Sequence, residues 1–196
     1  MKRNDVFREI RPYFTSGELS KLECAYNLSK LGHGYKGGQE RDDGSRYFEH
    51  PKLVMMIIFN VFLIKTDLKS LIAALLHDLR EDIYLIIERM IRILFGKIVN
   101  KVVMFVTKDE NSKPIFFARL LCCNNWRAIA IKLADRIHNM STLGNCTKEK
   151  QRKQVKETEE YYFKLCDYLE TIIPKRFSFV PEIARKELRR LCDLYK

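Results

Sequence analysis

Residues 71–78 read LIAALLHD, an unbroken apolar run that ends on an adjacent histidine and aspartate. Asp67 stands four residues before the run, where it can cap a helix from Leu68 to about Leu79. Burial of His77 and Asp78 at the end of such a helix is costly unless both groups find partners. A divalent ion such as manganese, iron or zinc would partner an imidazole and a carboxylate together. The stretch therefore predicts a buried helix that ends at a metal-binding position.

The rest of the chain favours further helices and shows no sustained strand-like alternation. Thr15 and Glu18 have the spacing of a capping box for a helix to about residue 30, and Pro51 fits the first turn of another. Residues 32–49 contain five glycines and many charges, so we expect a loop there. Further helices are predicted over residues 83–94, 97–106, 115–123, 127–142 and 148–170, and from Pro181 onward. With 196 residues and no repeat or linker, the sequence predicts an all-α, single-domain helical bundle.

The chain is basic, with a net charge of +11 spread along its length. This balance favours an anionic partner, although a basic solvated surface is an equally good interpretation. The N-terminal sequence MKRNDVFREI lacks the apolar run of a signal peptide, and no apolar stretch reaches the roughly 20 residues that span a bilayer. The six cysteines form no Cys-x-x-Cys pair. We therefore expect reduced thiols and a cytoplasmic protein.

Two further acids, Glu81 and Asp82, follow the His77-Asp78 pair at once. On a helix, Glu81 lies one turn from His77 and Asp78, and Asp82 lies one turn from Asp78. Carboxylates that stand beside a metal site without being ligands are placed to act as a general base for water. A helix cap or a solvated acidic turn is the alternative interpretation, and the spacing alone leaves both open.

The segment 132–143, KLADRIHNMSTL, places polar groups on one side of a predicted helix. Asp135, Asn139 and Thr142 are spaced i, i+4 and i+7, so they share a face. A carboxylate, an amide and a hydroxyl on one face suit one metal ligand and two hydrogen-bonding groups for a polar substrate. His138 is interpreted as a core histidine or one that supports a ligand from behind. The hydrophobic positions fall largely on the other side and are expected in the core: Leu133, Ile137 and Met140.

These residues form part of an ordered series of motifs. The series consists of GQER at 38–41, Gly44, YFEHP at 47–51, AALLHDLRED at 73–82, FG at 95–96, VTK at 106–108, KLADRIHNMSTL at 132–143, and ET at 157–158 with Tyr162. The pattern of His50, His77-Asp78 and Asp135 resembles the HD superfamily of metal-dependent phosphohydrolases. The full series, over about residues 20–165, resembles more closely the hydrolase domain of RelA/SpoT-type enzymes, which remove the 3′-pyrophosphate of ppGpp-like alarmones.

The resemblance implies a fold, a cofactor and a reaction. It implies an HD-type bundle with one domain over residues 1–196, in which the C-terminal helices 148–196 pack on the motif-bearing core. One divalent ion, usually Mn²⁺, would be held by His50, His77, Asp78 and Asp135. Glu81 and Asp82 would be catalytic, positioning and activating the water that converts ppGpp or pppGpp to GDP or GTP and pyrophosphate. The expected substrate contacts are Arg41, Arg46, Tyr47, Lys132, Asn139 and Thr142.

The sequence departs from the family pattern near the expected nucleotide site. Asp42 and Asp43 follow Arg41, where a lysine is common, while Arg46 replaces a common proline and could restore the positive charge. Lys36 stands where a histidine is common, and Ser141 where an arginine is common. Because of these changes, the base of the nucleotide is less well defined by the resemblance than the hydrolytic reaction.

Two alternative functions remain open at this point. Another HD phosphohydrolase, such as a 5′-nucleotidase or a cyclic-nucleotide phosphodiesterase, would share the ligands but would not explain Glu81-Asp82 together with HNMSTL. Hydrolysis of (p)ppApp, NADPH or another nucleotide by the same ligands also remains open. A non-catalytic nucleotide- or RNA-binding module would not need four acids together, and no RNA-binding motif is present. The four acids are Asp78, Glu81, Asp82 and Asp135. We therefore expect a phosphorylated nucleotide as the partner, with neither membrane nor nucleic acid, and a stand-alone hydrolase without a synthetase domain. The sequence does not indicate the oligomeric state.

Overall fold

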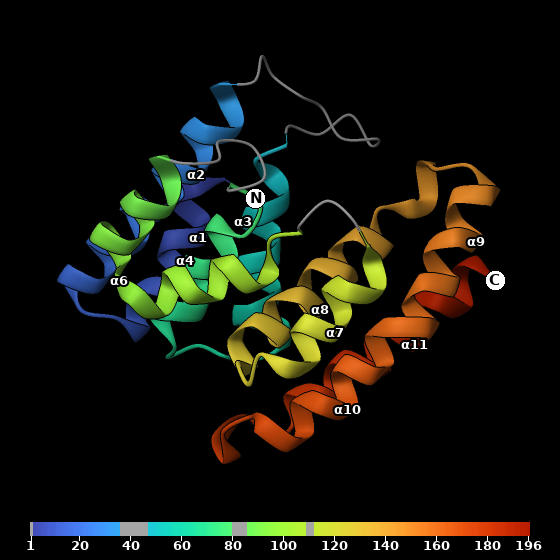
Figure 1. Ribbon diagram of the computed structural model, residues 1–196. Coiled ribbons are helices and arrows are strands. Elements are labelled where there is room, and N and C mark those ends of the chain that lie inside the picture. Colours follow the sequence, from blue (N-terminus) through green and yellow to red (C-terminus); the bar gives the residue numbers. More distant parts are fainter. Residues whose placement is uncertain (1, 36–46, 80–85, 109–111) are drawn as a thin grey trace.

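The computed structural model describes residues 2–35, 47–79, 86–108 and 112–196, and every regular element in those ranges is helical (Figure 1). The α-helices are α1 (Arg3–Ile10), α2 (Ser16–Tyr35), α3 (Glu49–Met56), α4 (Leu68–Leu76), α6 (Ile86–Val106), α7 (Lys113–Cys122), α8 (Trp126–Ser141), α9 (Lys148–Glu157), α10 (Phe163–Ile172) and α11 (Val180–Tyr195). Two π-helical segments follow α3 and α9, at Ile57–Val61 and Thr158–Tyr162. The predicted all-α fold is confirmed.

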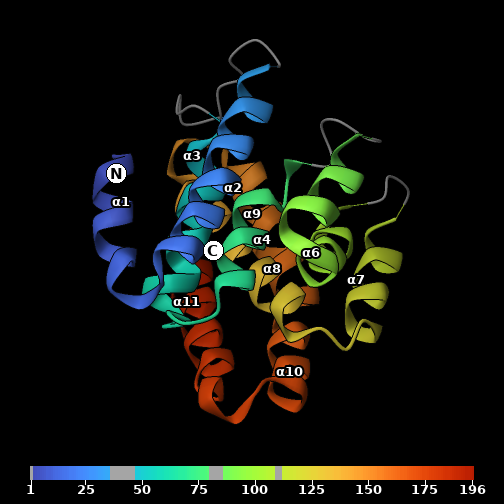
Figure 2. The same ribbon diagram turned by 90° about the vertical axis from the view of Figure 1, so that its left-hand side faces the viewer.

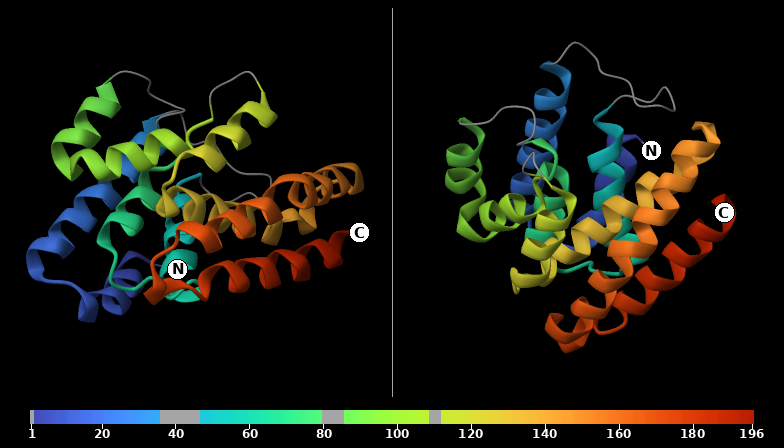
Figure 3. Two further views of the ribbon diagram at one scale, coloured as in Figure 1. Left: turned by 60° about the horizontal axis from the view of Figure 1, so that its bottom comes forward. Right: turned by 45° about the vertical axis from the view of Figure 1, so that its right-hand side comes forward.

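Helices α4 and α8 form the centre of the bundle. Helix α4 packs against α2, α3, α6 and α8, and α8 also packs against α3, α6, α10 and α11. Figures 2 and 3 show α8 between the N-terminal helices and the C-terminal pair α10 and α11. Every side chain from Ser70 to Leu76 is buried, as is every side chain from Ala128 to His138. Because α8 carries ionisable groups at this depth, each of them needs a partner within the bundle.

The predicted helix starts are confirmed by their hydrogen bonds. The Thr15 amide donates to Glu18 Oε2 over 2.9 Å, and the Glu18 amide donates to Thr15 Oγ1 over 3.3 Å, which completes a capping box for α2. Asp67 Oδ2 accepts a hydrogen bond of 3.0 Å from the Ser70 amide at the start of α4. These caps set the first turns of two helices that pack directly on each other.

The loop predicted from residue 32 begins too early, because α2 continues to Tyr35. Gly32 serves close packing: a β-carbon at this position would lie 2.1 Å from Leu79 Cδ1, just after α4. Residues 36–46, which contain most of the predicted loop, lie outside the described residues. Helix α1 was not predicted, although Val6, Phe7 and Ile10 are buried on one side of it.

The predicted helices of the C-terminal half are confirmed, with two local departures. Helix α6 covers two predicted helices and bends between them at Gly96, whose φ of +88° is the left-handed value that favours glycine. The helix predicted over residues 148–170 is interrupted by the π-helical segment, and its predicted apolar stripe is buried: Val155, Tyr162, Leu165 and Leu169. Within the described part of the chain, no helix is long and apolar enough to cross a bilayer.

An ion pair between the partly buried Arg127 and the buried Asp67 connects the start of α8 to the cap of α4. Arg127 Nε and Nη2 donate to the two carboxylate oxygens of Asp67, each over 2.8 Å. Burial on its own would raise the pKa of Asp67, but hydrogen bonds from Arg127 and Ser70 outweigh it and hold that pKa below its usual range. The pair therefore stabilises the folded state at pH values where the carboxylate is ionised.

Arg127→Met is expected to lower the free energy of unfolding at pH 7 by about 2–3 kcal/mol, because it leaves a buried carboxylate without its bidentate partner. A depressed folded-state pKa contributes stability above the unfolded value and loses it as the pH falls through the folded value. The difference between the two proteins should therefore shrink below about pH 4. Urea unfolding at several pH values measures this. Arg190→Met, which removes an exposed pair with Glu187, is the control and should change little. An equal loss in both variants would contradict the prediction.

Candidate active site

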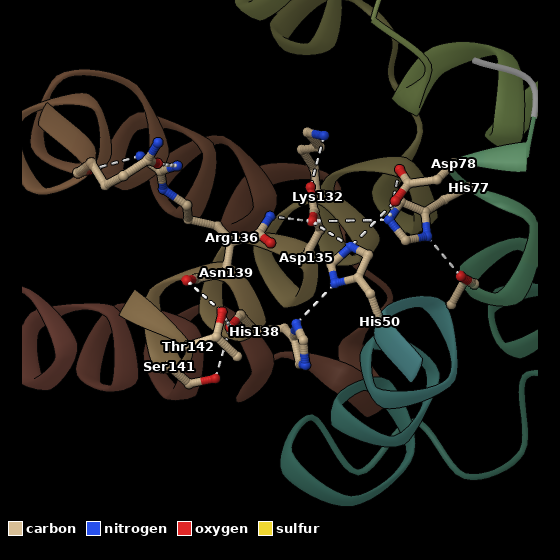
Figure 4. Close-up of polar contacts among 12 residues, drawn as sticks. His50, His77, Asp78, Lys132, Asp135, Arg136, His138, Asn139, Ser141 and Thr142 are labelled. Carbon is tan, nitrogen blue, oxygen red and sulfur yellow. Dashed lines mark hydrogen bonds and ion pairs between the residues drawn. The ribbon is translucent and has the colours of Figure 1, made fainter. Parts of the chain in front are cut away.

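Four of the predicted site residues converge from three helical segments (Figure 4). His50 comes from the first turn of α3, His77 and Asp78 follow the end of α4, and Asp135 lies in the middle of α8. His50 Nε2 lies 3.1 Å from Asp135 Oδ1 and 3.3 Å from Asp78 Oδ2. His77 Nε2 lies 3.0 Å from Asp78 Oδ1 and 3.9 Å from Asp135 Oδ1. Two imidazoles and two carboxylates thus face one point.

The hydrogen bond behind His77 leaves a lone pair directed at the cluster. His77 Nδ1 lies 2.8 Å from the carbonyl oxygen of Ala74, which can only accept, so Nδ1 carries the proton. His77 Nε2 is then unprotonated in the neutral ring, and it is buried without a hydrogen bond of acceptable geometry. A buried acceptor nitrogen left in this way is what a metal ion would satisfy. Ligand atoms of His50, His77 and Asp78 all lie within 4.8 Å of one another, close enough to share one ion.

The electrostatics of the cluster also favour a cation. Burial alone would raise the pKa values of Asp78 and Asp135, but the neighbouring histidines, and Lys132 beside Asp135, lower both below their usual range. Burial would lower the pKa of His50, yet hydrogen bonds to Asp135 and Asp78 raise it. The pocket therefore keeps its carboxylates ionised and stabilises positive charge between them, as a divalent cation requires. The donor set fits a metal ion.

Two other residues of α8 hold Asp135 in place. Lys132 Nζ donates to Asp135 Oδ2 over 2.8 Å, and Asn139 Nδ2 donates to Asp135 Oδ1 over 2.6 Å. The ammonium of Lys132 is buried, and the charge of Asp135 raises its pKa although burial opposes this. Lys132 is thus bound to the carboxylate of a candidate ligand, and a direct contact between Lys132 and a substrate stays a prediction.

A polar pocket of about 260 Å³ adjoins the cluster along the predicted face of α8. Asp135, Asn139 and Thr142 line it, as the spacing of these residues indicated. The structure adds basic residues to which the sequence gave no role: Lys108, Lys113, Arg136 and Lys150. Two of these residues lie in the motif series, Lys108 in VTK and Arg136 in KLADRIHNMSTL, while Lys113 and Lys150 come from helices α7 and α9, which carry no such signal. Two acids, Asp135 and Glu157, line the same pocket, and the four cations leave an excess of positive charge that suits an anionic ligand.

Two basic residues of this pocket make bonds across it: Lys113 Nζ donates to Glu157 Oε2, and the guanidinium of Arg136 makes several hydrogen bonds. Nε donates to Thr158 Oγ1 over 2.8 Å and Nη2 donates to the Gln154 carbonyl over 2.7 Å. These bonds connect α8 to α9 and to the π-helical segment that follows it, so Arg136 shapes the wall of the pocket. Thr142 Oγ1 lies 3.1 Å from the Asn139 carbonyl, at the end of the same helix.

Among the remaining predicted site residues, only Tyr47 lies in the described part of the chain. Arg41, Arg46, Glu81 and Asp82 lie outside the described residues. Tyr47 is described and half-buried, with its ring centroid 4.9 Å from that of His33. Its predicted contact with a substrate stays a prediction.

Comparison with known proteins places the chain in a family. No family model matches it. It is 32% identical to the bifunctional (p)ppGpp synthase/hydrolase SpoT of Escherichia coli K12, over 90% of this chain and 28% of that protein. A solved structure described as a metazoan ortholog of SpoT that hydrolyses ppGpp matches with a TM-score of 0.63 and 26% identity, covering 89% of this chain and 97% of that one. This chain belongs to the SpoT-related HD family. It therefore has the HD-type helical fold that the motif series predicted.

Other relatives of this SpoT-related chain carry different names. The guanosine-3′,5′-bis(diphosphate) 3′-pyrophosphohydrolase of Haemophilus influenzae is 37% identical over 67% of the chain and 20% of that protein. The GTP pyrophosphokinase of Streptomyces coelicolor is 34% identical over 84% of the chain and 20% of that protein. The chain spans less than a third of the length of these curated relatives, so membership of the family does not by itself decide between hydrolysis and synthesis.

Proposed function

We propose that the chain is a metal-dependent hydrolase that removes the 3′-pyrophosphate of ppGpp and pppGpp and leaves GDP and GTP. The observation that carries the proposal is the buried cluster of two histidines and two aspartates, with the unsatisfied Nε2 of His77, beside a pocket rich in cations. Such a cluster suits activation of water, and the pocket suits a phosphorylated ligand.

Hydrolysis is favoured over synthesis because a relative described as hydrolysing ppGpp matches this segment over nearly its whole length. The SpoT protein named for both activities is several times longer than this chain, whereas the metazoan ortholog described as hydrolysing ppGpp is matched over nearly its whole length. In the proposed reaction, the oxygen of water bonds to the phosphorus attached to the ribose 3′-oxygen. The bond between that phosphorus and the 3′-oxygen breaks, pyrophosphate leaves, and the 3′-oxygen takes up a proton.

Each residue of the candidate site has a proposed role in this reaction. His50, His77, Asp78 and Asp135 would hold the cation, which when bound lowers the pKa of water and neutralises phosphoryl charge. Glu81 or Asp82 would accept the proton of the attacking water. Asn139 and Thr142 would bind the ribose and phosphates from the α8 face, with Arg41, Arg46 and Tyr47 on the nucleotide. Lys108, Lys113 and Lys150 would add positive charge around the pyrophosphate. Manganese is the proposed ion because mixed imidazole and carboxylate ligands suit it, and the family resemblance implies it.

The purified chain with Mn²⁺ is expected to convert ppGpp to GDP and pyrophosphate, with both products in equal amounts by anion-exchange chromatography. Treatment with EDTA should abolish the conversion and added Mn²⁺ should restore it, because the cluster without its cation lacks the water-activating charge. Parallel reactions with ppApp, NADPH and dGTP identify the nucleotide preference, which the acidic pair Asp42-Asp43 leaves open. Intact ppGpp beside rapid, metal-dependent hydrolysis of another nucleotide would replace the proposed substrate and keep the HD assignment.

A further inference from the structure

A third histidine lies directly behind the candidate metal centre. His138 Nδ1 is 2.8 Å from His50 Nδ1, and the two rings are tilted by 57° with their centroids 4.8 Å apart (Figure 4). Both side chains are buried. His50 therefore has both ring nitrogens engaged: Nε2 faces Asp78 and Asp135, and Nδ1 faces His138.

The proton count of the two rings restricts how they pair. A neutral imidazole carries one proton, and a nitrogen that binds a metal ion must keep its lone pair. If His50 Nε2 is the ligand atom, the single proton of the neutral His50 ring is on Nδ1, and this N–H needs an acceptor. His138 Nδ1 is at hydrogen-bond distance, so it must be unprotonated. The opposite arrangement, with His138 donating, would leave the proton of a neutral His50 on Nε2 and remove that nitrogen as a ligand.

The helix that carries His138 makes this arrangement rigid. His138 follows Asp135 by three residues in α8, so the two side chains are one turn apart. Asp135 Oδ1 approaches Nε2 of His50 over 3.1 Å, while His138 approaches the opposite side of the same ring. Helix α8 thus holds the α3 histidine from two directions. His77 differs, because its Nδ1 bonds to the main-chain carbonyl of Ala74, which no side-chain substitution removes.

We propose that His138 is a positioning residue whose unprotonated Nδ1 accepts the Nδ1 proton of His50 and so keeps His50 Nε2 available to the metal ion. The inference rests on the metal centre of the proposed function and is independent of which nucleotide is hydrolysed. Groups that support metal-binding histidines in this way typically change metal affinity by about 10–100-fold when they are removed.

The test measures Mn²⁺ binding alone, without nucleotide, through the electron paramagnetic resonance signal of the free ion. His138→Phe keeps an aromatic ring but no acceptor, and it should weaken binding by about 10–100-fold. His138→Asn places an amide oxygen near the former Nδ1, so it should bind nearly as well as the wild type. Thermal melting confirms that each variant is folded, and His138→Leu replaces His138→Phe if the latter is not.

Two results would overturn the role of His138. One is wild-type affinity for Mn²⁺ in folded His138→Phe or His138→Leu, which have no acceptor. The other is equal weakening in His138→Asn and His138→Phe, because packing and not the acceptor would then be responsible. A wild-type protein that binds Mn²⁺ but leaves ppGpp intact, with the expected order of the His138 variants, would remove the proposed substrate and keep this inference.

Discussion

Replacing Asp135 with alanine is expected to lower Mn²⁺ affinity by more than about a hundredfold and to reduce ppGpp hydrolysis to near background. Asp135 Oδ1 is the oxygen that approaches both histidine Nε2 atoms, at 3.1 Å for His50 and 3.9 Å for His77. Asp78 approaches the same two nitrogens through separate oxygens, Oδ2 at 3.3 Å from His50 and Oδ1 at 3.0 Å from His77, so removing Asp135 removes the single oxygen that faces both histidines. The substitution should therefore weaken binding of the ion, and the loss of hydrolysis should follow from that weaker binding.

The alanine variant also leaves the buried ammonium of Lys132 without its carboxylate, which costs stability of about 3–5 kcal/mol. Asp135→Asn separates the two effects, because its amide oxygen can still accept from Lys132 while the ligand charge is gone. Metal content after dialysis and urea unfolding should be measured on both variants. Asp167→Asn, an exposed aspartate paired with Arg185, is the matched control and should keep both metal and activity. Full metal occupancy in the folded Asp135→Asn variant would remove Asp135 from the ligand set.

Local sequence patterns predicted the parts of the site that depend on one helix. The apolar run before His77 predicted a buried helix, and the i, i+4, i+7 spacing placed Asp135, Asn139 and Thr142 along one pocket. These predictions succeed because helical periodicity relates spacing to direction without reference to other parts of the chain. The same reasoning identified the core face of α8, where Leu133, Ile137 and Met140 are buried.

Features that depend on contacts between helices were not predictable in this way. Lys113 of α7 and Lys150 of α9 line the same pocket as residues of α8, which no spacing in the sequence indicates. Gly32 was interpreted as part of a loop, because the sequence gives no sign that Leu79 lies against it. Lys132 and Asp135 form an i, i+3 ion pair, a spacing usually found on exposed helix surfaces. Lys132 is buried because α8 lies in the centre of the bundle, which this spacing does not indicate. Spacing specifies which side of a helix a residue occupies, but not what covers that side.

Glu81→Gln and Asp82→Asn are expected to retain the metal ion and to lower kcat by about 10²–10⁴-fold. Both residues lie outside the described residues, and their role comes from the sequence: they follow His77 and Asp78 within about one helical turn. The proposed ligand set already contains four residues, His50, His77, Asp78 and Asp135, whose side chains lie together in the structure. A fifth and sixth ligand are unnecessary, so Glu81 and Asp82 are more useful as acceptors of the proton from water. Such a group acts only in the transition state, which places the effect on kcat and not on ligand binding.

Metal titration and steady-state kinetics on the same preparations decide the division of roles. Each variant should bind Mn²⁺ and ppGpp as the wild type does, with the loss confined to turnover. Glu182→Gln, an exposed residue in α11, is the isosteric control for the change from Glu to Gln. If Glu81→Gln or Asp82→Asn instead loses the ion, that residue is a ligand and one of the four assigned ligands becomes a candidate for the base. If both variants keep the ion and full turnover, the proton is taken up elsewhere, and the pair is the solvated acidic turn that its spacing also allows.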